Sequence, residues 1–267
     1  MNPVGKSRDV LHGPFGIFQK WKRMILLSEV KVYAHRGASG YALENTWNAF
    51  FKACELGVGI ELDVQITKDG VVVVYHDDNL RRLAGVNAEI ETLAYEEIKE
   101  LRIGKRWLRN FQHHQMPLAY EVFQWAKKKK IPLNVELKES FAKNSNGPQI
   151  LAAMLEGIED IHLSSFNLQL LRRMKKLMPS TEMAWIVKKN AQLSRINEMH
   201  WIDSIHLHKR LLAKNVWTDI LKLDKKVRLY GVLGSESLID RLDPQTVGII
   251  TDYPDRVKRK IASALVG

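Results

Sequence analysis

Short β-branched segments alternate with amphipathic helical stretches along most of the chain, and this alternation constrains the fold more than any other feature. The segments with strand character cover residues 30–34, 59–64, 131–136, 160–165, 182–187, 203–207, 227–232 and 247–251. Helical periodicity is found near residues 45–56, 119–129, 148–157, 168–177, 191–199, 211–222, 235–242 and 254–265. Strands that alternate with helices at this spacing predict a parallel sheet. Eight such units in one chain of 267 residues predict an α/β fold of the closed (β/α)8 TIM barrel type.

An open, doubly wound parallel sheet is the alternative architecture, but no glycine-rich dinucleotide fingerprint follows the first predicted strand. No linker rich in proline, glycine or serine divides the chain. We therefore expect one barrel domain over residues 30–267, preceded by an N-terminal extension over residues 1–29.

The stretch "GIFQKWKRMILL" within this extension predicts an extra amphipathic helix, because several of its large apolar residues gather near one face. Such a helix can cover the lower end of the barrel or form a dimer contact. It can equally lie on an anionic membrane through residues 16–27, since lysines and an arginine occupy the rest of its surface. We favour packing, and the oligomeric state stays open.

The sequence "ITKDGVVVVYHDD" interrupts the regular alternation. Asp69-Gly70 between two apolar runs is typical of a hairpin turn. Because parallel barrel strands cannot be joined by so short a turn, residues 71–75 are expected to form a small antiparallel ribbon with the second strand, above the barrel mouth. Counting back from the turn places His76 roughly opposite Glu61.

Three carboxylates are expected at the ends of two predicted barrel strands. Glu61 and Asp63 lie two residues apart near the end of the second strand, so both point to the same side. Glu136 ends the third strand. Active sites of such barrels lie at the C-terminal ends of the strands, and three inward carboxylates there repel one another unless a cation is present. Oxygen ligands predict a hard divalent cation, Mg²⁺ or Ca²⁺, rather than Zn²⁺.

Two histidines and two cationic side chains are expected at the same mouth. His35 and Arg36 directly follow the first strand, Lys138 points the same way as Glu136, and the ribbon delivers His76. A divalent ion and Arg36 can together hold the non-bridging oxygens of a phosphate. One histidine can then remove a proton from the attacking hydroxyl or water, and the other can protonate the leaving alkoxide. This constellation predicts phosphodiester cleavage.

The segments "AHRGASGYALENTWNAF", "IELDVQITKDGVVVVYHDDNLRR" and "NVELK" together resemble the glycerophosphodiester phosphodiesterase family. The later segments "SSF" at 164–166 and "GIITDYPD" at 248–255 fit the end of the same pattern, so the resemblance runs from residue 31 to residue 256. It implies a TIM barrel, a divalent metal, and hydrolysis of glycerophosphodiesters to glycerol 3-phosphate and an alcohol.

The resemblance also implies a role for each motif residue. The implied roles are acid-base catalysis for His35 and His76, metal binding for Glu61, Asp63 and Glu136, phosphate binding for Arg36 and Lys138, and a position near the site for Glu44. Glu44 can also serve as a negative charge at a helix N-terminus. The chain departs from the family pattern at Leu43, where the family has proline, and at "LYGVL" (229–233), which bears on substrate preference.

Several features of the activity stay open. A lysophospholipase D-type phosphodiesterase that acts on lysolipids at a membrane surface is the alternative enzyme, with the N-terminal helix gripping lipid. The sequence does not decide whether water or the glycerol hydroxyl attacks first, and it leaves the metal and the alcohol headgroup undetermined.

The formal net charge of +11 and the pI of about 9.6 favour anionic partners. A catalytically inactive basic scaffold that binds nucleic acid is therefore the rival from another class. Basic groups are scattered over several predicted helices, and neither a zinc-finger pattern nor an RNA-binding aromatic motif is found. We expect a small-molecule phosphodiester as the partner and no nucleic acid.

Cys54 is the single cysteine, so an intramolecular disulfide is excluded and a reducing compartment is favoured. No apolar run reaches the length that spans a bilayer, and the first 30 residues lack the features of a signal peptide. We expect a cytoplasmic enzyme of lipid and glycerol metabolism, with peripheral membrane contact left open.

Overall fold

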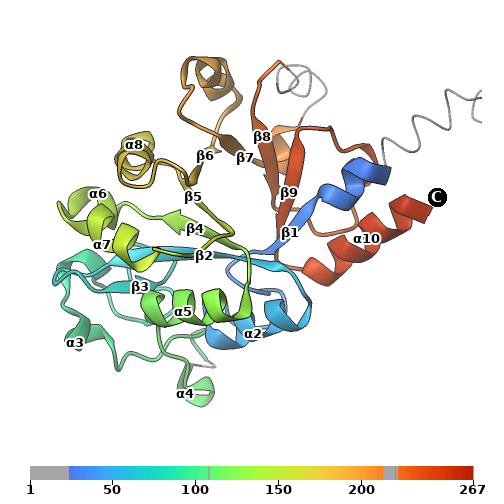
Figure 1. The fold of residues 1–267 in the computed structure, drawn as a ribbon. Coiled ribbons are helices and arrows are strands. Elements are labelled where there is room, and N and C mark those ends of the chain that lie inside the picture. Colours follow the sequence, from blue (N-terminus) through green and yellow to red (C-terminus); the bar gives the residue numbers. More distant parts are fainter. Residues whose placement is uncertain (1–23, 108, 213–219, 221, 267) are drawn as a thin grey trace, which may run out of the picture.

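The computed structural model describes residues 24–107, 109–212, 220 and 222–266 (Figure 1). Within these residues, eight parallel strands close into a barrel, as predicted. They are β1 (Lys31–Ala34), β2 (Gly59–Ile66), β4 (Leu133–Leu137), β5 (Ile161–Ser165), β6 (Glu182–Val187), β7 (Ser204–His208), β8 (Lys226–Tyr230) and β9 (Thr246–Thr251). The strands follow one another around the barrel in the order β1-β9-β8-β7-β6-β5-β4-β2, and pairing of β1 with β2 closes it.

The strand β3 (Val72–Val74) lies outside the barrel and pairs with β2 in antiparallel fashion, which confirms the predicted ribbon. Val64 pairs with Val74, and the backbone N–H of Tyr75 donates to the Asp63 carbonyl oxygen at 3.0 Å. His76 therefore falls next in line, opposite Leu62, one residue from the predicted position. The ribbon pairs with Val64, the predicted end of the second strand, and with the two residues by which β2 extends beyond it.

Helices cover the outside of the barrel, with the longest ones where helical periodicity predicted them. They are α2 (Trp47–Glu55), α5 (Ala119–Lys129), α7 (Gly147–Met154), α8 (Leu168–Leu177) and α10 (Pro254–Val266), together with the four-residue helix α6 (Ser140–Lys143). The four-residue helices α3 (Tyr95–Ile98) and α4 (Arg109–Gln112) lie away from the barrel wall, between β3 and β4 in the chain. Short 3-10 segments are η1 (Ile90–Thr92), η2 (Asn190–Glu198), η3 (Lys209–Leu211) and η4 (Ser237–Arg241).

Two predicted α-helices are therefore wrong in type, because residues 190–198 and 237–241 form 3-10 turns. Periods of 3.6 and 3.0 residues differ little over two turns, so the apolar pattern does not separate them. Most of the helix predicted over residues 211–222 lies outside the described residues.

Alternation along β2 shows how the sequence separates the core from the site. Every residue of β2 is buried, yet its two faces differ. Ile60 and Leu62 belong to the large apolar cluster that also contains Phe50 of α2 and Phe123 of α5. The intervening residues point to the barrel interior, where the carboxylates lie. The helices thus bury the apolar face and leave the polar face at the barrel axis.

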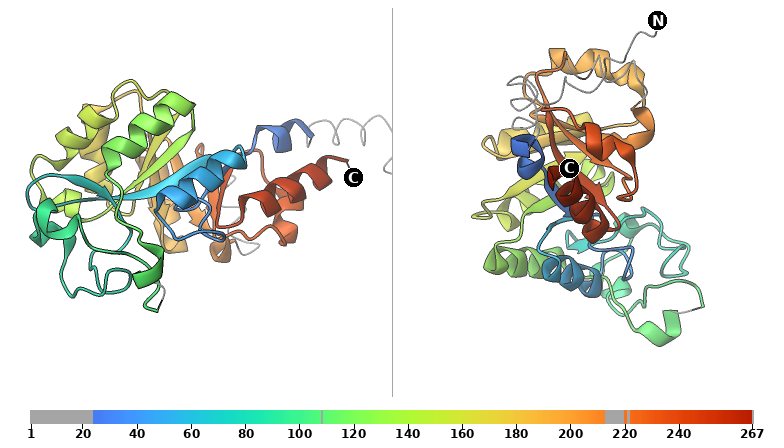
Figure 2. Two further views of the ribbon diagram at one scale, coloured as in Figure 1. Left: turned by 90° about the horizontal axis from the view of Figure 1, so that it is seen from below. Right: turned by 90° about the vertical axis from the view of Figure 1, so that its right-hand side faces the viewer.

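Residues 75–118 form a lobe with a separate core, which the sequence did not predict beyond the ribbon. Its buried residues are Val73, Tyr75, Leu80, Leu83, Ala84, Ile90, Ile98, Ile103 and Met116. Leu43, the residue that departs from the family pattern, packs partly buried against this cluster. Figure 2 shows the lobe projecting from one side of the barrel, with α4 at its outer tip.

Residues 1–23 of the predicted N-terminal extension lie outside the described residues. Residues 24–29 are helical, and Leu27 is buried in the barrel's apolar cluster, whereas Ile25 is exposed. This part of the extension therefore packs on the barrel. Among the described residues, no helix combines the length and the apolar character needed to cross a bilayer.

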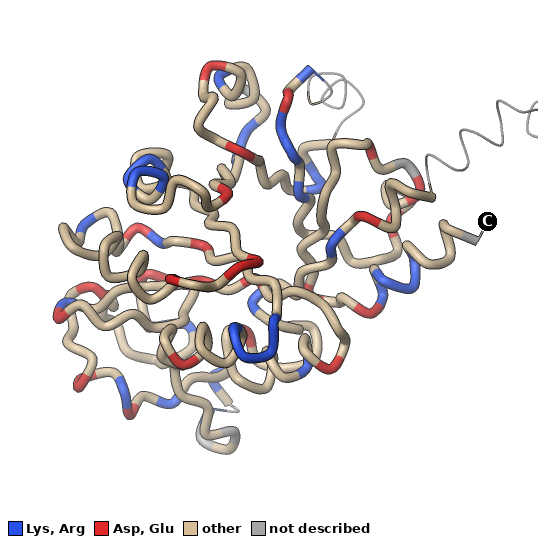
Figure 3. The backbone as a smooth tube through the Cα atoms, viewed as in Figure 1, with Lys and Arg blue, Asp and Glu red and all other residues tan. Residues whose placement is uncertain are grey.

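Lys and Arg residues are spread over several helices (Figure 3). The run of lysines at 127–130 forms one continuous positive segment at the C-terminal end of α5. Cations at this end of a helix interact favourably with its dipole. The run therefore has a structural explanation that requires no nucleic-acid partner.

Candidate active site and metal centre

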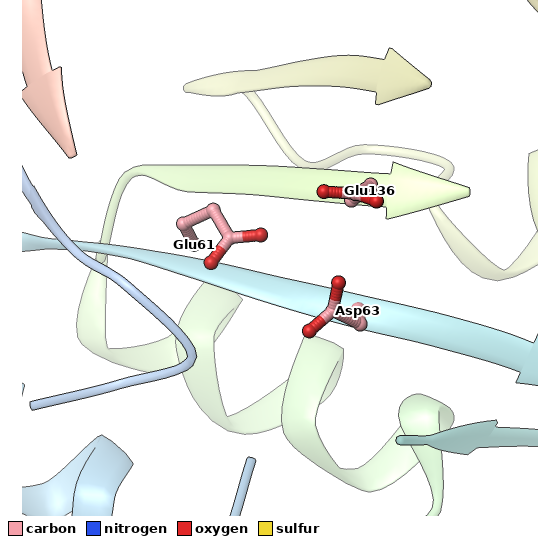
Figure 4. Close-up of side chains that lie close together, drawn as sticks. All are labelled: Glu61, Asp63 and Glu136. Carbon is pink, nitrogen blue, oxygen red and sulfur yellow. The ribbon is translucent and has the colours of Figure 1, made fainter. Parts of the chain in front are cut away.

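Glu61, Asp63 and Glu136 meet at the mouth of the barrel. Glu61 and Asp63 lie on β2, and Glu136 pairs in register with Asp63 from the neighbouring strand β4. Figure 4 shows the three carboxylates turned toward a common space, and one oxygen from each lies within 4.8 Å of the others. The predicted acidic trio is therefore a cluster in the folded chain, contributed by two adjacent parallel strands.

Lys138 is the cation closest to this cluster. Its Nζ lies 2.7 Å from Asp63 Oδ1 and also donates a hydrogen bond to Glu136. The side chain is almost fully buried, so the positive charge is shared between two carboxylates rather than with water. Glu61 has no such lysine partner in the described part of the chain, and the three carboxylates carry two more negative charges than Lys138 neutralises.

The pKa values express this imbalance. Burial, followed by repulsion from Asp63 and Glu136, raises the pKa of Glu61 to about 8. Burial also acts to raise the pKa of Asp63, but Lys138 and Arg36 outweigh it and hold that pKa well below its usual range. Burial acts to lower the pKa of Lys138, but the Asp63 and Glu136 carboxylates raise it by more, so the net shift is upward.

Three buried carboxylate oxygens at this separation suit a hard divalent cation. Mg²⁺ and Ca²⁺ take oxygen ligands, and an added positive charge would allow Glu61 to remain ionised. The donor set contains no sulfur or imidazole atom, which disfavours a zinc site. The residues therefore fit the metal that the sequence predicts.

His35 lies at the end of β1, where its backbone N–H donates to the Thr251 carbonyl oxygen of β9 at 2.9 Å. Its Nδ1 lies 2.6 Å from Oδ1 of Asp252, the residue that follows β9. Burial lowers the pKa of His35, but the hydrogen bond to Asp252 and the nearby Glu61 carboxylate raise it further than burial lowers it. The His35 ring is thus oriented by the carboxylate of Asp252, a residue near the other end of the sequence.

Arg36 adopts a left-handed conformation with φ of 55°, which turns the chain back over the barrel end. Its backbone N–H donates to Glu61 Oε2 at 2.8 Å, and its Nη1 donates to Glu44 Oε1 at 2.7 Å. The Nε atom lies 3.4 Å from Asp63 Oδ2 and, although buried, has no hydrogen-bond partner. Asn45 supplies one more donor, 2.8 Å from the same Asp63 oxygen.

His76 directly follows the ribbon residue Tyr75. Its Nδ1 lies 2.7 Å from Asp77 Oδ1, so this ring is also oriented by a carboxylate. The charge of the His76 ring contributes to lowering the pKa of Asp63. One histidine therefore acts on each end of the β2 acidic pair, since His35 acts in the same way on Glu61.

Arg82 connects the ribbon side of the site to the first loop. Its guanidinium donates to Glu44 at 2.7 and 2.8 Å and to Asp77 Oδ2 at 2.5 Å. Glu44 therefore holds two arginines and lies outside the three-carboxylate cluster. Burial raises the pKa of Glu44, but Arg82 and Arg36 prevail and lower it.

The structure brings all the predicted site residues to one end of the barrel, and adds four that sequence reasoning missed. The missed residues are Asn45, Asp77, Arg82 and Asp252. Each stands beside a recognised motif: Asn45 in "ENT", Asp77 in "HDD", Arg82 in "NLRR" and Asp252 in "TDYPD". A polar residue directly after a predicted barrel strand was the available signal for Asp252.

A cavity of about 440 Å³ opens beside His35 and Asp252. Arg36, Tyr41 and Glu44 border it from the first loop, and Lys105 reaches it from the lobe. A small organic ligand can therefore approach the His35 side of the acidic cluster between the barrel and the lobe.

Comparisons with known proteins agree with this geometry. Residues 35–256 match the family described as "Glycerophosphoryl diester phosphodiesterase family". The chain is 33% identical over 244 residues to "Uncharacterized protein YqiK" of Bacillus subtilis (strain 168). The matched region covers 88% of this chain and 98% of that protein.

A second relative is a "Glycerophosphodiester phosphodiesterase" of Caldanaerobacter subterraneus subsp. tengcongensis, 38% identical over 155 residues, or 55% of this chain and 63% of that protein. Among solved structures, an Oleispira antarctica phosphodiesterase in complex with the product sn-glycerol-3-phosphate superposes with a TM-score of 0.75. It is 28% identical and covers 91% of this chain and 99% of its own.

Proposed function

The chain belongs to the glycerophosphoryl diester phosphodiesterase family, and from this premise we propose that it hydrolyses glycerophosphodiesters to glycerol 3-phosphate and an alcohol. The observation that carries the proposal is the acidic cluster of Glu61, Asp63 and Glu136 between two histidines that are each oriented by a carboxylate. The product complex of the Oleispira antarctica phosphodiesterase supports the same product class.

Glu61, Asp63 and Glu136 would hold a divalent cation, Mg²⁺ or Ca²⁺. Such an ion, when bound, supplies positive charge that polarises the phosphate and neutralises charge developing on its oxygens. The raised pKa of Glu61 supports this role, because an unpaired buried carboxylate is stabilised in its ionised form by a cation.

Arg36 and Lys138 would bind the phosphate. The buried Nε of Arg36 has a hydrogen to donate but no hydrogen-bond partner, since Asp63 Oδ2 lies 3.4 Å away without accepting it, so an incoming phosphate oxygen would satisfy it. Lys138 can turn part of its hydrogen bonding from Asp63 and Glu136 to the phosphate once another cation shares those carboxylates. Glu44 would act as a positioning residue that holds the Arg36 guanidinium.

His35 and His76 would transfer the protons. Asp252 and Asp77 occupy the two Nδ1 positions, so each ring has its Nε2 available for the substrate. One Nε2 takes the proton from the attacking oxygen as the new P–O bond forms. The other Nε2 gives a proton to the alcohol oxygen as its bond to phosphorus breaks. Water or a glycerol hydroxyl can supply the attacking oxygen.

Product analysis of single histidine variants tests this assignment. We expect His35→Gln and His76→Gln each to lower the rate of glycerol 3-phosphate release from glycerophosphocholine by roughly a hundred- to ten-thousand-fold. His114→Gln, a change in the lobe away from the acidic cluster, should retain the wild-type rate and serves as the matched control. Wild-type turnover in either site variant, with folding verified by circular dichroism, would refute the acid-base roles.

A lysophospholipase D-type activity is the second candidate, favoured by large aromatic side chains exposed on the lobe next to the cavity. Glycerophosphocholine and a lysophospholipid contain the same phosphodiester and differ in the acyl chain. Comparing kcat/KM for the two substrates separates the candidates. Turnover of the soluble diester supports the first, and turnover confined to the lysolipid replaces it with the second.

A further inference from the structure

Two large aromatic side chains stand exposed at the tip of the lobe. Trp107 is 74% exposed and Phe111 is 79% exposed, the highest exposures among the large apolar side chains in the described part of the chain. Neither is among the residues that form the lobe core or pack against it. We call these two side chains the aromatic tip. Exposed apolar groups of this size in a folded protein mark a surface that contacts something else.

The aromatic tip borders the proposed active site. Lys105, two residues before Trp107, lines the same cavity of about 440 Å³ as His35 and Asp252. Tyr41, a third exposed aromatic residue at 46%, lines that cavity from the opposite side. Anything that the tip contacts is thus held next to the opening through which a substrate reaches His35.

The segment that carries the tip is fastened to the lobe. Nη1 of Arg109 donates to the Ala84 carbonyl oxygen at 2.7 Å, and it passes so close to Gly85 that a Cβ atom there would lie 2.0 Å from it. The backbone N–H of Ile103, which is fully buried, donates to the His114 carbonyl oxygen at 2.8 Å. Contacts of Ile103 and Arg109 thus tie the described residues on either side of Trp107 to the rest of the lobe.

The charge around the tip is positive. Lys105 and Arg106 are exposed and have no carboxylate partner in the described part of the chain, whereas most other arginines near the site are paired. Cations next to aromatic rings match the interface of an anionic bilayer, where the rings enter the headgroup region and the cations meet lipid phosphates and carboxylates.

We propose that the aromatic tip docks the enzyme on an anionic lipid surface, with the opening beside His35 turned toward the lipid headgroups. This inference rests on the proposed function, because the headgroups of that surface contain phosphodiesters that the proposed enzyme would cleave. It places the contact on the lobe rather than on residues 16–27. Docking gives the site a locally high concentration of lipid-borne substrate without changing its chemistry.

Vesicle binding tests the docking directly. The wild-type protein and the double variant Trp107→Ala/Phe111→Ala are mixed with phosphatidylcholine vesicles that contain phosphatidylserine, and the bound fraction is measured by sedimentation. We expect the double variant to bind at least ten times more weakly, which is a loss of about 1.4 kcal/mol. Tyr120→Ala, which removes a 56% exposed aromatic side chain from α5, is the matched control and should bind as the wild type does.

Activity measurements separate failure of this inference from failure of the proposed function. The double variant should hydrolyse soluble glycerophosphocholine at the wild-type rate and a vesicle-borne lysophospholipid at least ten times more slowly. Equal vesicle binding by the wild type and the double variant would overturn the docking, as would a wild-type dimer in light scattering that the double variant loses. A wild type that binds vesicles through the tip but cleaves no glycerophosphodiester would overturn the proposed function and leave the docking standing.

Discussion

Several side chains of the site are held by partners of opposite charge from distant parts of the chain. Asp252 orients His35 across 217 positions of sequence, and Arg82 joins Glu44 to Asp77. Motif spacing therefore predicted Glu44 and the residues to which we assign a role on the substrate, but not the other residues that hold them. Long-range pairs are fixed by closure of the barrel, and a single sequence contains no direct signal of that closure.

At this scale, Asp252→Asn should impair catalysis while leaving the fold intact. An amide cannot supply the negative charge that orients the His35 ring and stabilises its protonated form, so kcat should fall by roughly ten- to a hundred-fold. Steady-state kinetics with glycerophosphocholine measures the loss. Asp160→Asn, which loses an exposed ion pair with Lys31 at the start of β1, is the control and should retain activity. Equal losses in both variants would exclude a specific role for Asp252.

Lys138→Met should lower stability when divalent cations are absent. The change leaves Asp63 and Glu136 buried without their shared cation, which costs about 3–5 kcal/mol of unfolding free energy. Thermal unfolding with and without Mg²⁺ or Ca²⁺ should then show a larger metal-induced rise of Tm in the variant than in the wild type. Lys143→Met, which breaks an exposed pair with Glu91, should cost about 0–1 kcal/mol and respond to metal as the wild type does.

Elements of the barrel followed closely from the sequence, whereas the lobe did not. β-branched strands and amphipathic helices carry a period that can be counted, and the eight parallel strands lie within two or three residues of their predicted bounds. The lobe is built from four-residue helices and turns joined by contacts such as Gly104 N–H to the Leu83 carbonyl oxygen. Elements this short have no measurable period, so residues 75–118 could not be predicted beyond the ribbon.

The first loop depends on a glycine that no other residue can replace without strain. Gly37 has φ of 73°, and a Cβ atom there would lie 2.7 Å from the Ala49 backbone and side chain of α2. Gly37→Ala should therefore destabilise the protein by about 2–5 kcal/mol and displace His35 and Arg36.

Gly57→Ala provides the comparison for that variant. Gly57 also has positive φ, of 61°, but faces open space apart from a distant lysine end. Its replacement should cost only the conformational strain, about 1–2 kcal/mol, and should preserve activity. Urea unfolding of the two variants measures the difference, and equal destabilisation would show that the contact with α2 is unimportant.

For the molecule as a whole, two buried histidines inside the barrel should make stability depend on pH. His162 and His206 lie edge to face with ring centroids 5.5 Å apart, and the Nε2 atom of each lacks a hydrogen-bond partner. Burial, followed by the charge of Arg228, lowers the pKa of His206 to about 3 and lowers that of His162 well below its usual value.

The unfolded chain therefore binds protons that the folded chain rejects once the pH falls below about 6.5. Because the folded pKa is depressed, the stabilisation is complete above the unfolded pKa and is lost as the pH falls toward 3. His206 alone should cost about 2 kcal/mol of unfolding free energy between pH 7 and pH 5. Urea unfolding at both pH values should show a smaller loss in His206→Gln, and an unchanged loss would mean that His206 does not contribute.

The sequence-based predictions agree best with the structure at the C-terminal ends of β1, β2 and β4, where the barrel positions polar site residues. Active sites of such barrels lie at these strand ends, so polar residues there were expected to meet, while the ribbon added His76 and the family resemblance added Glu44. The aromatic tip is different, because exposure of Trp107 and Phe111 results from how the lobe packs and has no local signature in the sequence.

Phosphorus NMR of glycerophosphocholine turnover tests the central claim most directly, since it identifies the broken bond and the dependence on metal in one experiment. After removal of divalent ions by chelation, we predict no product; restoring Mg²⁺ or Ca²⁺ should produce the glycerol 3-phosphate resonance. Undiminished hydrolysis in excess chelator, or phosphocholine as the product, would contradict the account.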